Sequence, residues 1–363
     1  MKRLLCLISC MNRGGAETFL MKVYRALDRT RLQMDFCINV AEKCDYEDEI
    51  YALGGQIFRI PSKTENASAF KSQLTRIVCD NGYETVLRIT SSAVGFWDLK
   101  IAKQAGALRT IARSSNASDG KGVAQTILHK VGQLLWTKYV DVKIAPSDLA
   151  AEYTFGKKLY QSGKVTILPN GLDLGVFHFE PDERIRVRKE FGIAEETQVL
   201  GHIGRFNLQK NHKFLLDVFS VYLQEHKDAV LLLVGEGTLR NEIEVQARSL
   251  GIVDKVIFTG LRIDVPALLS AMDVLVFPSF YEGMPNVVIE AQACGLPCVI
   301  SDTITREADV AGMVTFLPIN DTECWVKEIE ALCGKRNTKK MPIEYDIRNV
   351  VEEFSKLCFS GGE

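Results

Sequence analysis

The sequence predicts an α/β protein of two domains, and three observations support that prediction. Short apolar runs bounded by turn residues recur along the chain, and their continuous hydrophobicity is typical of strands covered on both faces, as in parallel sheets. Amphipathic stretches separate these runs, so strand and helix alternate. The 363 residues also exceed the size at which a single hydrophobic core stops growing.

The expected strands form two sheets of about six strands each. In the first half of the chain they are KRLLCLIS, MDFCINV, QIFRI, TVLRIT, RTIAR, VKIAPS and VTILPNG. In the second half they are VLGHIGR, AVLLLVG, KVIFTG, VLVFPS, PCVIS and MVTFLP. The amphipathic segments 16–28, 211–226 and 239–251 are expected helices, the last of them ending at Gly251.

A charged segment, 176–197, has little strand character and separates the two series. We therefore expect two doubly wound Rossmann-like domains, over 1–176 and 177–344. Residues 345–363 are expected to form a last helix. The sequence does not show where this helix packs, and it could pack back toward the N-terminal domain. Ligands of open parallel sheets bind beyond the carboxyl ends of the strands, so we expect an active site in a cleft between the facing sheets.

Composition and charge narrow the class of protein and its compartment. A formal net charge of −2 gives no global field for nucleic acid, so no nucleic-acid partner is expected. The ten cysteines lack C-x-x-C spacing and read as reduced thiols. The opening MKRLLCLISC is interrupted by Met11-Asn12-Arg13 without a cleavage site, which favours a first buried strand over a signal peptide. We expect a cytoplasmic protein.

Two loops carry residues suited to phosphate. Gly14 and Gly15 lie between the first strand and the first helix, whose N-terminus would favour an anion, although a plain turn is an equal alternative. Arg205 and Lys210 leave one strand end in HIGRFNLQKNH and could clamp a diphosphate, Arg by a fork and Lys as a point charge. Ordinary surface charges are the alternative for that pair.

The stretch SFYEGMPNVVIEAQACGLPCVIS contains two glutamates around a turn that leads into a helix. Pro285 suits the first helical turn, and the N–H groups around it would point at an anion. Glu282 lies before the turn and Glu290 roughly two helical turns beyond it, so each could accept hydrogen bonds from a different sugar. A nucleotide sugar has that layout of hexose, diphosphate and ribose.

These motifs together resemble the retaining glycosyltransferases of family 4, which have the two-domain GT-B architecture. The resemblance covers most of the second half, including GRFNLQKNH, LLVGEGTLRNEIE and the Glu-x7-Glu pair, and extends to GGAE and LPNGLD. It implies transfer of a sugar, with retention, from a nucleoside diphosphate sugar, most often a UDP-sugar, to a growing saccharide. Similar proteins build capsular, exopolysaccharide or lipopolysaccharide chains in bacteria.

The resemblance also implies a role for each matching residue. Arg205 and Lys210 would hold the diphosphate and stabilise the leaving group, while Glu282 would contact the donor sugar and Glu290 the ribose. The remaining donor-binding positions are Gly14 and Gly15 from the other domain, Gly260, Leu261 and Arg262 near the base, and Met284, Pro285, Asn286 and Val287 near the sugar and phosphates, together with Gly204 and Gly283.

No D-x-D motif occurs in the sequence, so we expect neither a metal nor another cofactor, with Arg205 and Lys210 supplying the positive charge. Two rival functions stay open. One is a sugar-nucleotide epimerase or phosphorylase of the same architecture, and the other is a non-catalytic sugar-nucleotide-binding protein. The sequence identifies neither the donor sugar, the acceptor and the linkage nor the oligomeric state.

One departure from the family concerns the acceptor side. Many relatives carry a motif like A-H-S-H-N, where this chain has Ala112-Arg113-Ser114-Ser115-Asn116. Either the lost histidines matter little because the leaving phosphate takes the acceptor proton, or Arg113, together with Arg88, shapes the cleft for an acidic substrate. Arg88, Arg113, Ser115 and Asn116 are therefore the acceptor-side candidates.

The segment KGVAQTILHKVGQLLWTKY, 121–139, mixes lysines with large apolar residues. An ordinary packed helix is one interpretation. A basic amphipathic helix on an anionic membrane surface is the other, and it would place the protein peripherally at the inner face of the plasma membrane, near a lipid-linked saccharide acceptor.

Overall fold

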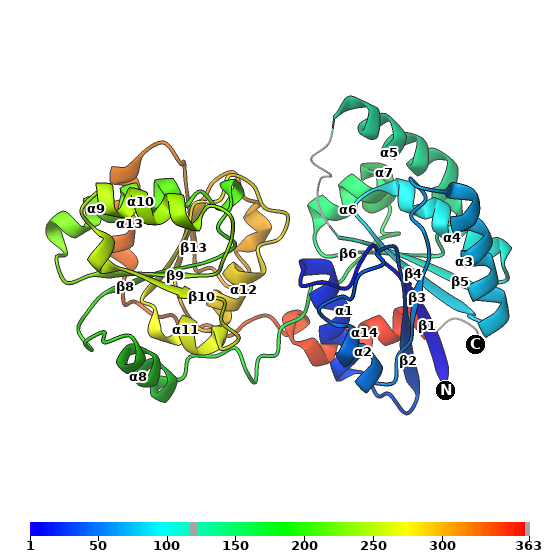
Figure 1. Ribbon diagram of the computed structural model, residues 1–363, viewed down its shortest axis with the longest axis horizontal. Coiled ribbons are helices and arrows are strands. Elements are labelled where there is room, and N and C mark those ends of the chain that lie inside the picture. The colour runs from blue at the N-terminus through cyan, green and yellow to red at the C-terminus, as the bar shows by residue number, and fades with distance from the viewer. Residues whose placement is uncertain (116–121, 360–363) are drawn as a thin grey trace. The chain divides into compact units, whose positions relative to one another are not determined.

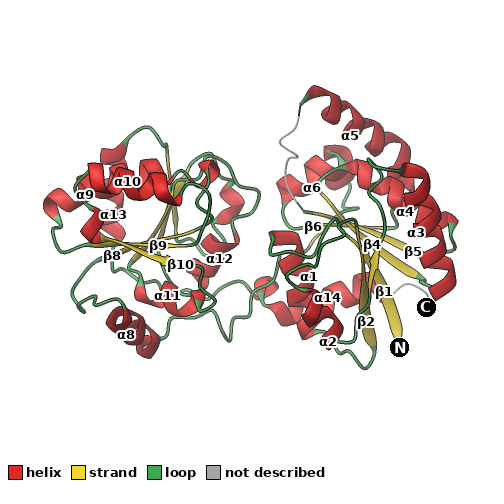
Figure 2. Ribbon diagram, viewed as in Figure 1, coloured by secondary structure: helices red, strands yellow, loops and turns green. Residues whose placement is uncertain are grey.

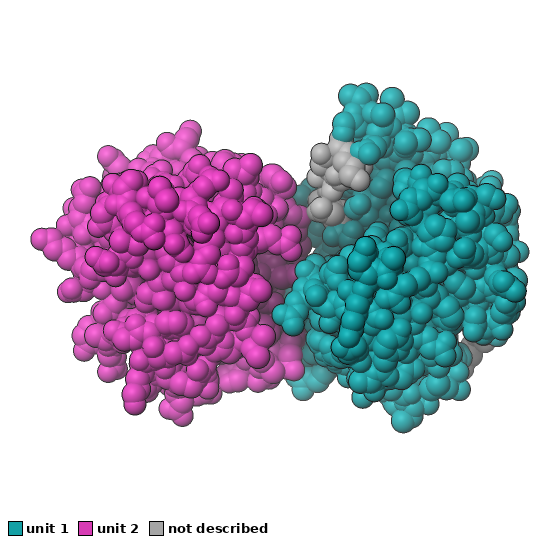
Figure 3. All heavy atoms as spheres, viewed as in Figure 1, with its two compact units in different colours: residues 1–171, 343–363 teal, residues 172–342 magenta. Residues whose placement is uncertain are grey.

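The computed structural model describes residues 1–115 and 122–359. They form two compact units, one of residues 1–171 with 343–363 and one of residues 172–342 (Figure 3). The limits expected from the sequence, 176/177 and 344/345, differ from these by only a few residues. Each unit is a doubly wound α/β structure (Figures 1 and 2).

The first unit is built on a seven-stranded parallel sheet of order β3-β2-β1-β4-β5-β6-β7. Its strands are β1 Lys2–Leu7, β2 Leu32–Ile38, β3 Ile57–Arg59, β4 Thr85–Thr90, β5 Arg109–Ser114, β6 Val142–Ala145 and β7 Thr166–Ile167. Its helices are α1 Gly15–Ala26, α2 Glu47–Ala52, α3 Ala67–Asn81, η1 Ala93–Gly95, α4 Phe96–Gln104, α5 Val123–Trp136, η2 Thr137–Tyr139, α6 Asp148–Phe155, α7 Lys157–Gln161, η6 Ile343–Tyr345 and α14 Ile347–Phe359.

The second unit is built on a six-stranded parallel sheet of order β10-β9-β8-β11-β12-β13. Its strands are β8 Val199–Ile203, β9 Val230–Val234, β10 Val256–Gly260, β11 Val274–Phe277, β12 Cys298–Ser301 and β13 Val314–Leu317. Its helices are α8 Pro181–Glu190, η3 Leu208–Lys210, α9 His212–Glu225, α10 Arg240–Ser249, η4 Val253–Lys255, α11 Val265–Ala271, α12 Asn286–Ala293, η5 Arg306–Ala308 and α13 Thr322–Leu332.

The pleat explains why continuous apolar runs became strands. In β1, Leu4 and Cys6 belong to the hydrophobic core on one face of the sheet, while Leu5 and Leu7 belong to the core on the other. Successive side chains of a strand point to opposite faces, so a strand covered on both sides needs apolar residues at every position. The predicted α/β fold with parallel sheets is confirmed, and so is the prediction that the chain opens on a buried strand.

The last helix, α14, belongs to the first unit and packs on α1. The rings of Phe19 in α1 and Phe354 in α14 meet edge to face with centroids 6.0 Å apart. Val350, Phe354 and Cys358 are buried on the same helix face, at the spacing of an amphipathic helix. The structure therefore assigns a place to a helix whose docking the sequence left open.

All ten cysteines are free thiols. Within the described residues, no helix combines the length and the hydrophobicity needed to cross a bilayer.

Candidate active site

The carboxyl ends of β8 and β11 bring Lys210 and Glu282 together. Lys210 Nζ lies 2.6 Å from Glu282 Oε1, although 72 positions separate the two residues in the chain. Both side chains are largely but not fully buried. The structure thus joins two of the three residues that the resemblance marks as catalytic, in one ion pair at the ligand-bearing edge of the sheet.

Main-chain contacts fix the two loops that carry this pair. The Phe280 N–H donates to the Gln209 carbonyl at 2.9 Å, and the Gln209 side-chain amide donates to the Tyr281 carbonyl at 2.9 Å. The Asn207 side chain accepts from the Lys210 N–H at 3.2 Å and so begins the short helix that ends at Lys210. The position of the ammonium group is therefore set by backbone structure rather than by a flexible surface loop.

A layer of aromatic rings lies beneath Lys210. Its Nζ is 4.5 Å from the centroid of the Phe277 ring, a cation–π arrangement. The imidazole rings of His202 and His212 meet at 4.6 Å, and each stacks on a phenylalanine, Phe277 and Phe206 respectively. This aromatic layer under Lys210 was not predicted from the sequence. Its only trace in the sequence is the histidine and phenylalanine content of HIGRFNLQKNH.

Burial keeps both of these histidines neutral. Desolvation, together with the neighbouring Lys210 charge, lowers the pKa of His212 to about 4. Desolvation is also the main reason that the pKa of His202 lies well below its usual range, and the neighbouring His212 lowers it further. His202 Nδ1 lies 2.9 Å from the Val276 carbonyl, so this nitrogen carries the proton. Lys210 is consequently the group that carries positive charge in this layer.

Close packing of backbone explains two glycines at this edge. A Cβ on Gly204 would lie 3.2 Å from the Lys210 side-chain carbons and 3.0 Å from His202 Nε2. Gly235 has φ +138°, and a Cβ there would lie 2.2 Å from the Gly204 carbonyl oxygen. The loop after β8 therefore lies directly on the end of β9, which leaves the strand ends accessible to a ligand at backbone level.

Arg205 follows Gly204 and differs from Lys210 in its surroundings. It is exposed, and it forms no ion pair with any residue in the described part of the chain. Its guanidinium therefore keeps its donors for an anion, whereas the Lys210 ammonium has a carboxylate partner in this structure.

The helix after Glu282 begins as the sequence predicts. Pro285 is its N-cap and α12 runs over Asn286–Ala293, so the positive end of the helix dipole lies at Asn286, and the Val288 N–H donates to the Pro285 carbonyl at 3.0 Å. Gly283, Met284, Asn286 and Val287 are partly buried around this start. Glu290, also partly buried, lies about 6 Å along the helix axis from Asn286 at the usual rise per residue.

The end of β10 carries the residues expected near a base. Gly260 has φ +73° and its carbonyl accepts from the Gly235 N–H at 3.0 Å. Leu261 is exposed. The Arg262 guanidinium is held by Glu190 at 2.5 Å and by Asp264 at 2.8 Å, and the hydrogen bonds from Arg262 hold the pKa of Asp264 well below its usual range. The Arg262 side chain is thus committed to a surface network.

The Gly14-Gly15 turn differs from its expected use. Gly14 has φ −140° and ψ 170°, extended backbone that any residue adopts. The Glu17 carboxylate lies beside Gly14, 2.4 Å from where a Cβ on that residue would be, but the end of this flexible side chain could move aside, so the structure does not require glycine at this position. Glu17 lies in the first turn of α1, where it interacts with the positive end of the helix dipole. A carboxylate therefore lies beside the turn that was expected to receive a phosphate, and contact of Gly14 and Gly15 with the donor stays a prediction.

The two acceptor-side arginines do not lie together. In the register of β4 and β5, Arg88 pairs with Ala112 and Ile89 with Arg113, so the two arginines point to opposite faces of the sheet. Arg88 Nε lies 2.9 Å from Asp98 Oδ2 in α4, and Lys63 Nζ lies 2.7 Å from Asp98 Oδ1. Arg88 and Arg113 therefore do not share one face of the sheet, and their role toward an acidic substrate stays a prediction.

Arg113 is buried, with 1% of its surface exposed. It lies over the Phe19 ring at 3.6 Å and donates to the Asn170 side chain at 2.7 Å and the Leu168 carbonyl at 3.3 Å. Burial lowers its pKa to about 9. Ser115 follows it and is partly buried, while Asn116 lies outside the described residues.

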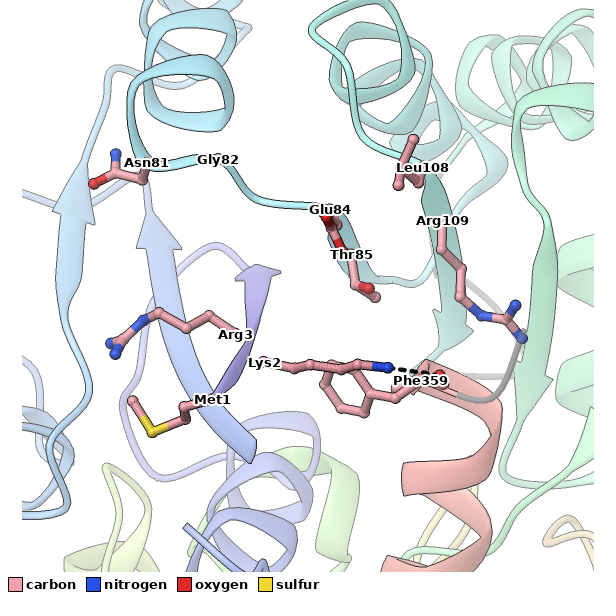
Figure 4. A pocket seen from close by; sticks show the side chains of 11 residues that line it. Met1, Lys2, Arg3, Asn81, Gly82, Glu84, Thr85, Leu108, Arg109 and Phe359 are labelled. Atoms are coloured by element: carbon pink, nitrogen blue, oxygen red, sulfur yellow. Dashed lines mark hydrogen bonds between the residues drawn. The ribbon is translucent and has the colours of Figure 1, made fainter. Parts of the chain in front are cut away.

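A cavity of about 380 Å³ opens at the amino ends of β1, β4 and β5 in the first unit. Its cations already have partners: Lys2 reaches the Phe359 carbonyl at 3.4 Å, Arg109 donates to the Leu357 carbonyl at 2.9 Å, and Arg3 pairs with Asp35 at 2.5 Å (Figure 4). Ligands of such sheets bind at the other end of the strands, so this hollow is not the candidate site. No cluster of three or more metal-ligating side chains occurs among residues 1–115 and 122–359.

Comparison with known proteins supports a sugar-transferring protein, as the residues at this edge of the sheet do. Residues 197–335 match the family model described as Glycosyl transferases group 1. "Putative glycosyltransferase EpsF" of Bacillus subtilis (strain 168) is 35% identical over 345 residues, which cover 93% of this chain and 90% of that protein. The UDP-Gal:alpha-D-GlcNAc-diphosphoundecaprenol alpha-1,3-galactosyltransferase of Escherichia coli is 32% identical over 150 residues, 40% of this chain and 39% of that enzyme.

Solved structures extend the likeness over the whole chain. HepE from Anabaena in complex with UDP and glucose superposes with a TM-score of 0.75 at 17% identity, covering 98% of this chain and 99% of that one. WaaG, a glycosyltransferase involved in lipopolysaccharide biosynthesis, has a TM-score of 0.68 at 15% identity, with 99% and 100% covered. The GT-B architecture expected from the sequence is confirmed.

Proposed function

The chain belongs to the group 1 glycosyltransferases, and from that premise we propose that it transfers a hexosyl unit, with retention of configuration, from a nucleoside diphosphate sugar to a saccharide or lipid-linked saccharide. The observation that carries the proposal is the Lys210–Glu282 ion pair at 2.6 Å, held between Arg205 and the start of α12. It combines a cation for a phosphate with a carboxylate for sugar hydroxyls.

In this proposal Arg205 and Lys210 neutralise the diphosphate as it leaves. The first-turn N–H groups of α12 add their dipoles, with Gly283, Met284 and Pro285 forming the approach to the helix. Charge that develops on a leaving group is best stabilised by donors fixed beforehand, and such donors typically contribute a few kcal/mol each. The backbone contacts that fix Lys210 meet that requirement.

The ion pair itself suggests how the donor is received. In the free protein Glu282 neutralises Lys210, which limits the cost of holding an ammonium group in a largely buried place. When a diphosphate takes over as the partner of Lys210, Glu282 becomes available as an acceptor for the hydroxyl groups of the donor sugar. Glu290 then accepts hydrogen bonds from the ribose. The backbone at Gly204, Gly260 and Leu261 borders the base, and the Arg262 side chain keeps its ion pairs with Glu190 and Asp264.

We propose a UDP-sugar as the donor. The supporting facts are that HepE, which shares the fold, was solved with UDP and glucose, and that the similar enzyme of Escherichia coli is named for UDP-Gal and a diphosphoundecaprenol acceptor. WaaG, which shares the fold and is involved in lipopolysaccharide biosynthesis, supports a place in the synthesis of bacterial surface polysaccharide. An acceptor of this kind is lipid-linked, so the proposal includes a peripheral contact with the inner face of the plasma membrane.

Retention and independence of metal belong to the same proposal. With two cations on the diphosphate, the leaving phosphate can take the acceptor proton while the acceptor oxygen bonds to the sugar on the same face from which the phosphate departs. Arg205 and Lys210 then take the electrostatic part of a divalent ion. The approach of Gly14 and Gly15 to the donor stays a prediction.

The test is to incubate the protein with a panel of nucleoside diphosphate sugars in the presence of a chelator. The slow hydrolysis of each donor is measured by the nucleotide released. We expect turnover of a UDP-sugar that Arg205→Ala abolishes, and that Arg186→Ala, an exposed arginine of α8 in surface ion pairs, leaves unchanged. A strict divalent requirement would contradict metal independence. Tight donor binding without turnover by any acceptor would instead identify a sugar-nucleotide-binding protein.

A further inference from the structure

Helix α5, Val123–Trp136, exposes its apolar side and packs on the first unit through the opposite side, where His129 and Gly132 are buried. Six large apolar residues are exposed on it, with Val123 at 78% and Leu134 at 84%. We call this set the outer face of α5; its members are Val123, Ile127, Leu128, Val131, Leu134 and Leu135. At 100° per residue they cover an arc of roughly 140°. The helix can be followed in the first unit in Figure 2.

The opposite side of α5 is fixed to the unit by polar and small residues. His129 Nδ1 accepts from the Ala93 N–H at 3.2 Å, and Nε2 donates to the Tyr153 carbonyl at 2.9 Å. A Cβ on Gly132 would lie 2.8 Å from the Ala93 carbonyl, and Gln133 donates to the Tyr153 carbonyl at 2.8 Å. The orientation of α5 is therefore set by directional contacts, and the exposure of its apolar residues does not result from loose docking.

The charges beside the outer face all have one sign. Residues 123–139 include no aspartate or glutamate, whereas Lys130 lies at the edge of the arc and Lys138 follows the helix. Both lysines are exposed, and neither forms an ion pair within the described residues. The end of α6, Asp148–Phe155, contacts α5 through the Tyr153 carbonyl; α6 carries Asp148 and Glu152, and two further exposed lysines, Lys157 and Lys158, begin α7 directly after it.

We propose that the outer face of α5 lies on the surface of an anionic lipid bilayer, with the helix in the plane of the interface. A contiguous apolar strip of this size is unfavourable in water and fits the boundary between headgroups and acyl chains. Lysines at the margin of such a strip bury their methylene stems and keep their ammonium groups among anionic headgroups. The uniform positive charge favours this occupant over a protein surface of mixed charge.

This inference rests on the proposed function only in that a lipid-linked acceptor would lie in the same membrane. Its test contains no nucleotide sugar, so the two fail separately. A vesicle assay that fails leaves donor hydrolysis untouched, and inactivity toward every donor leaves membrane binding untouched.

The experiment is sedimentation of the full-length protein with vesicles of phosphatidylcholine alone or mixed with phosphatidylglycerol. The test variant is Ile127→Gln/Leu134→Gln. The matched control is Ile185→Gln/Val245→Gln, two apolar residues of α8 and α10 that are 63% and 60% exposed. A third variant, Lys130→Gln/Lys138→Gln, removes the charges and keeps the apolar strip.

We expect wild-type protein to bind the anionic vesicles, and the apolar variant to lose at least about tenfold in partitioning, since two side chains of this size leave the acyl boundary. The lysine variant should lose its preference for phosphatidylglycerol, and the control should bind like wild type. Absence of binding by wild type, or equal binding by the apolar variant, would overturn the proposal. A wild-type dimer in light scattering that the apolar variant abolishes would identify a second copy as the occupant and overturn it as well.

Discussion

The two units share one architecture, yet they use the charged residues at the carboxyl ends of their strands in opposite ways. In the second unit Arg205 is exposed and Lys210 reaches one carboxylate, Glu282, so both cations can meet a ligand. In the first unit Arg113 is 1% exposed and holds Leu168 and Asn170 in place. The same sheet edge thus leaves cations accessible to a ligand in one unit and uses an arginine for internal structure in the other.

Electrostatics explains what the difference means. An arginine buried without a carboxylate pays for its desolvation through an aromatic face and carbonyl oxygens, and its pKa falls to about 9. Such a residue lies too deep in the unit to meet an incoming anion, although its Nε has no hydrogen-bond partner within the described residues. A partly exposed lysine whose carboxylate partner can be exchanged for a phosphate is better suited to an anion, which is why we propose that the second unit binds the donor.

The largest expected effect concerns Lys210. We expect Lys210→Ala to lower the rate of donor turnover by about 10² to 10³, the loss typical of removing one preorganised donor from a developing negative charge. Lys213→Ala is the matched control, because Lys213 lies one turn further along at the surface, 3.6 Å from Glu242. Steady-state nucleotide release measures both. Equal rates for the two variants would place the chemistry elsewhere.

Arg113 should affect stability and not turnover. Arg113→Ala leaves a cavity and unpaired carbonyl groups, and we expect it to destabilise the first unit by about 3 kcal/mol. Hydrogen exchange in β5 measures this loss, with the exposed Arg76→Ala as the control. Donor hydrolysis by the folded fraction should not change. A variant of normal stability that discriminates less between acidic and neutral acceptors would instead assign Arg113 to substrate binding.

The sequence predicted the fold well because burial on both faces leaves a direct trace in it, as the alternating core membership of Leu4, Leu5 and Cys6 shows. It also paired Lys210 with the region of Glu282, since both follow strand ends that open sheets bring together. It did not predict that Glu17 fills the space over Gly14, or that Arg88 points away from Arg113. Those facts depend on side-chain direction and register, which motif spacing does not encode.

The neutral histidines beneath Lys210 give the second unit a dependence on pH. His212 has a pKa of about 4 in the folded protein and an ordinary value of 6.5, so between these values the unfolded chain binds more protons. The stability contributed by neutral His212 is full above pH 6.5 and is lost as the pH falls toward 4. From pH 7 to pH 5 the loss is about 2 kcal/mol.

Replacing His212 by phenylalanine tests this dependence. The ring would keep its stacking on Phe206, now 4.5 Å between centroids, and would remove the titration. We expect His212→Phe to lose less stability than wild type between pH 7 and pH 5, as measured by hydrogen exchange in β8 and α9 under urea. Identical slopes for the two proteins would show that His212 does not titrate in this range.

The smallest effect is expected for Arg262, whose side chain pairs with Glu190 and Asp264 at the surface. Arg262→Gln should lower stability by less than about 1 kcal/mol, since exposed ion pairs contribute little and are screened by salt. It should also leave donor affinity within about threefold of wild type, because only the backbone at this position borders the base. Titration of UDP by calorimetry measures the affinity. A loss of donor affinity beyond about tenfold would show that the Arg262 guanidinium exchanges its carboxylate partners for the nucleotide, as Lys210 is proposed to do for the diphosphate. Both cations would then form ion pairs in the free protein and bind the donor in the complex.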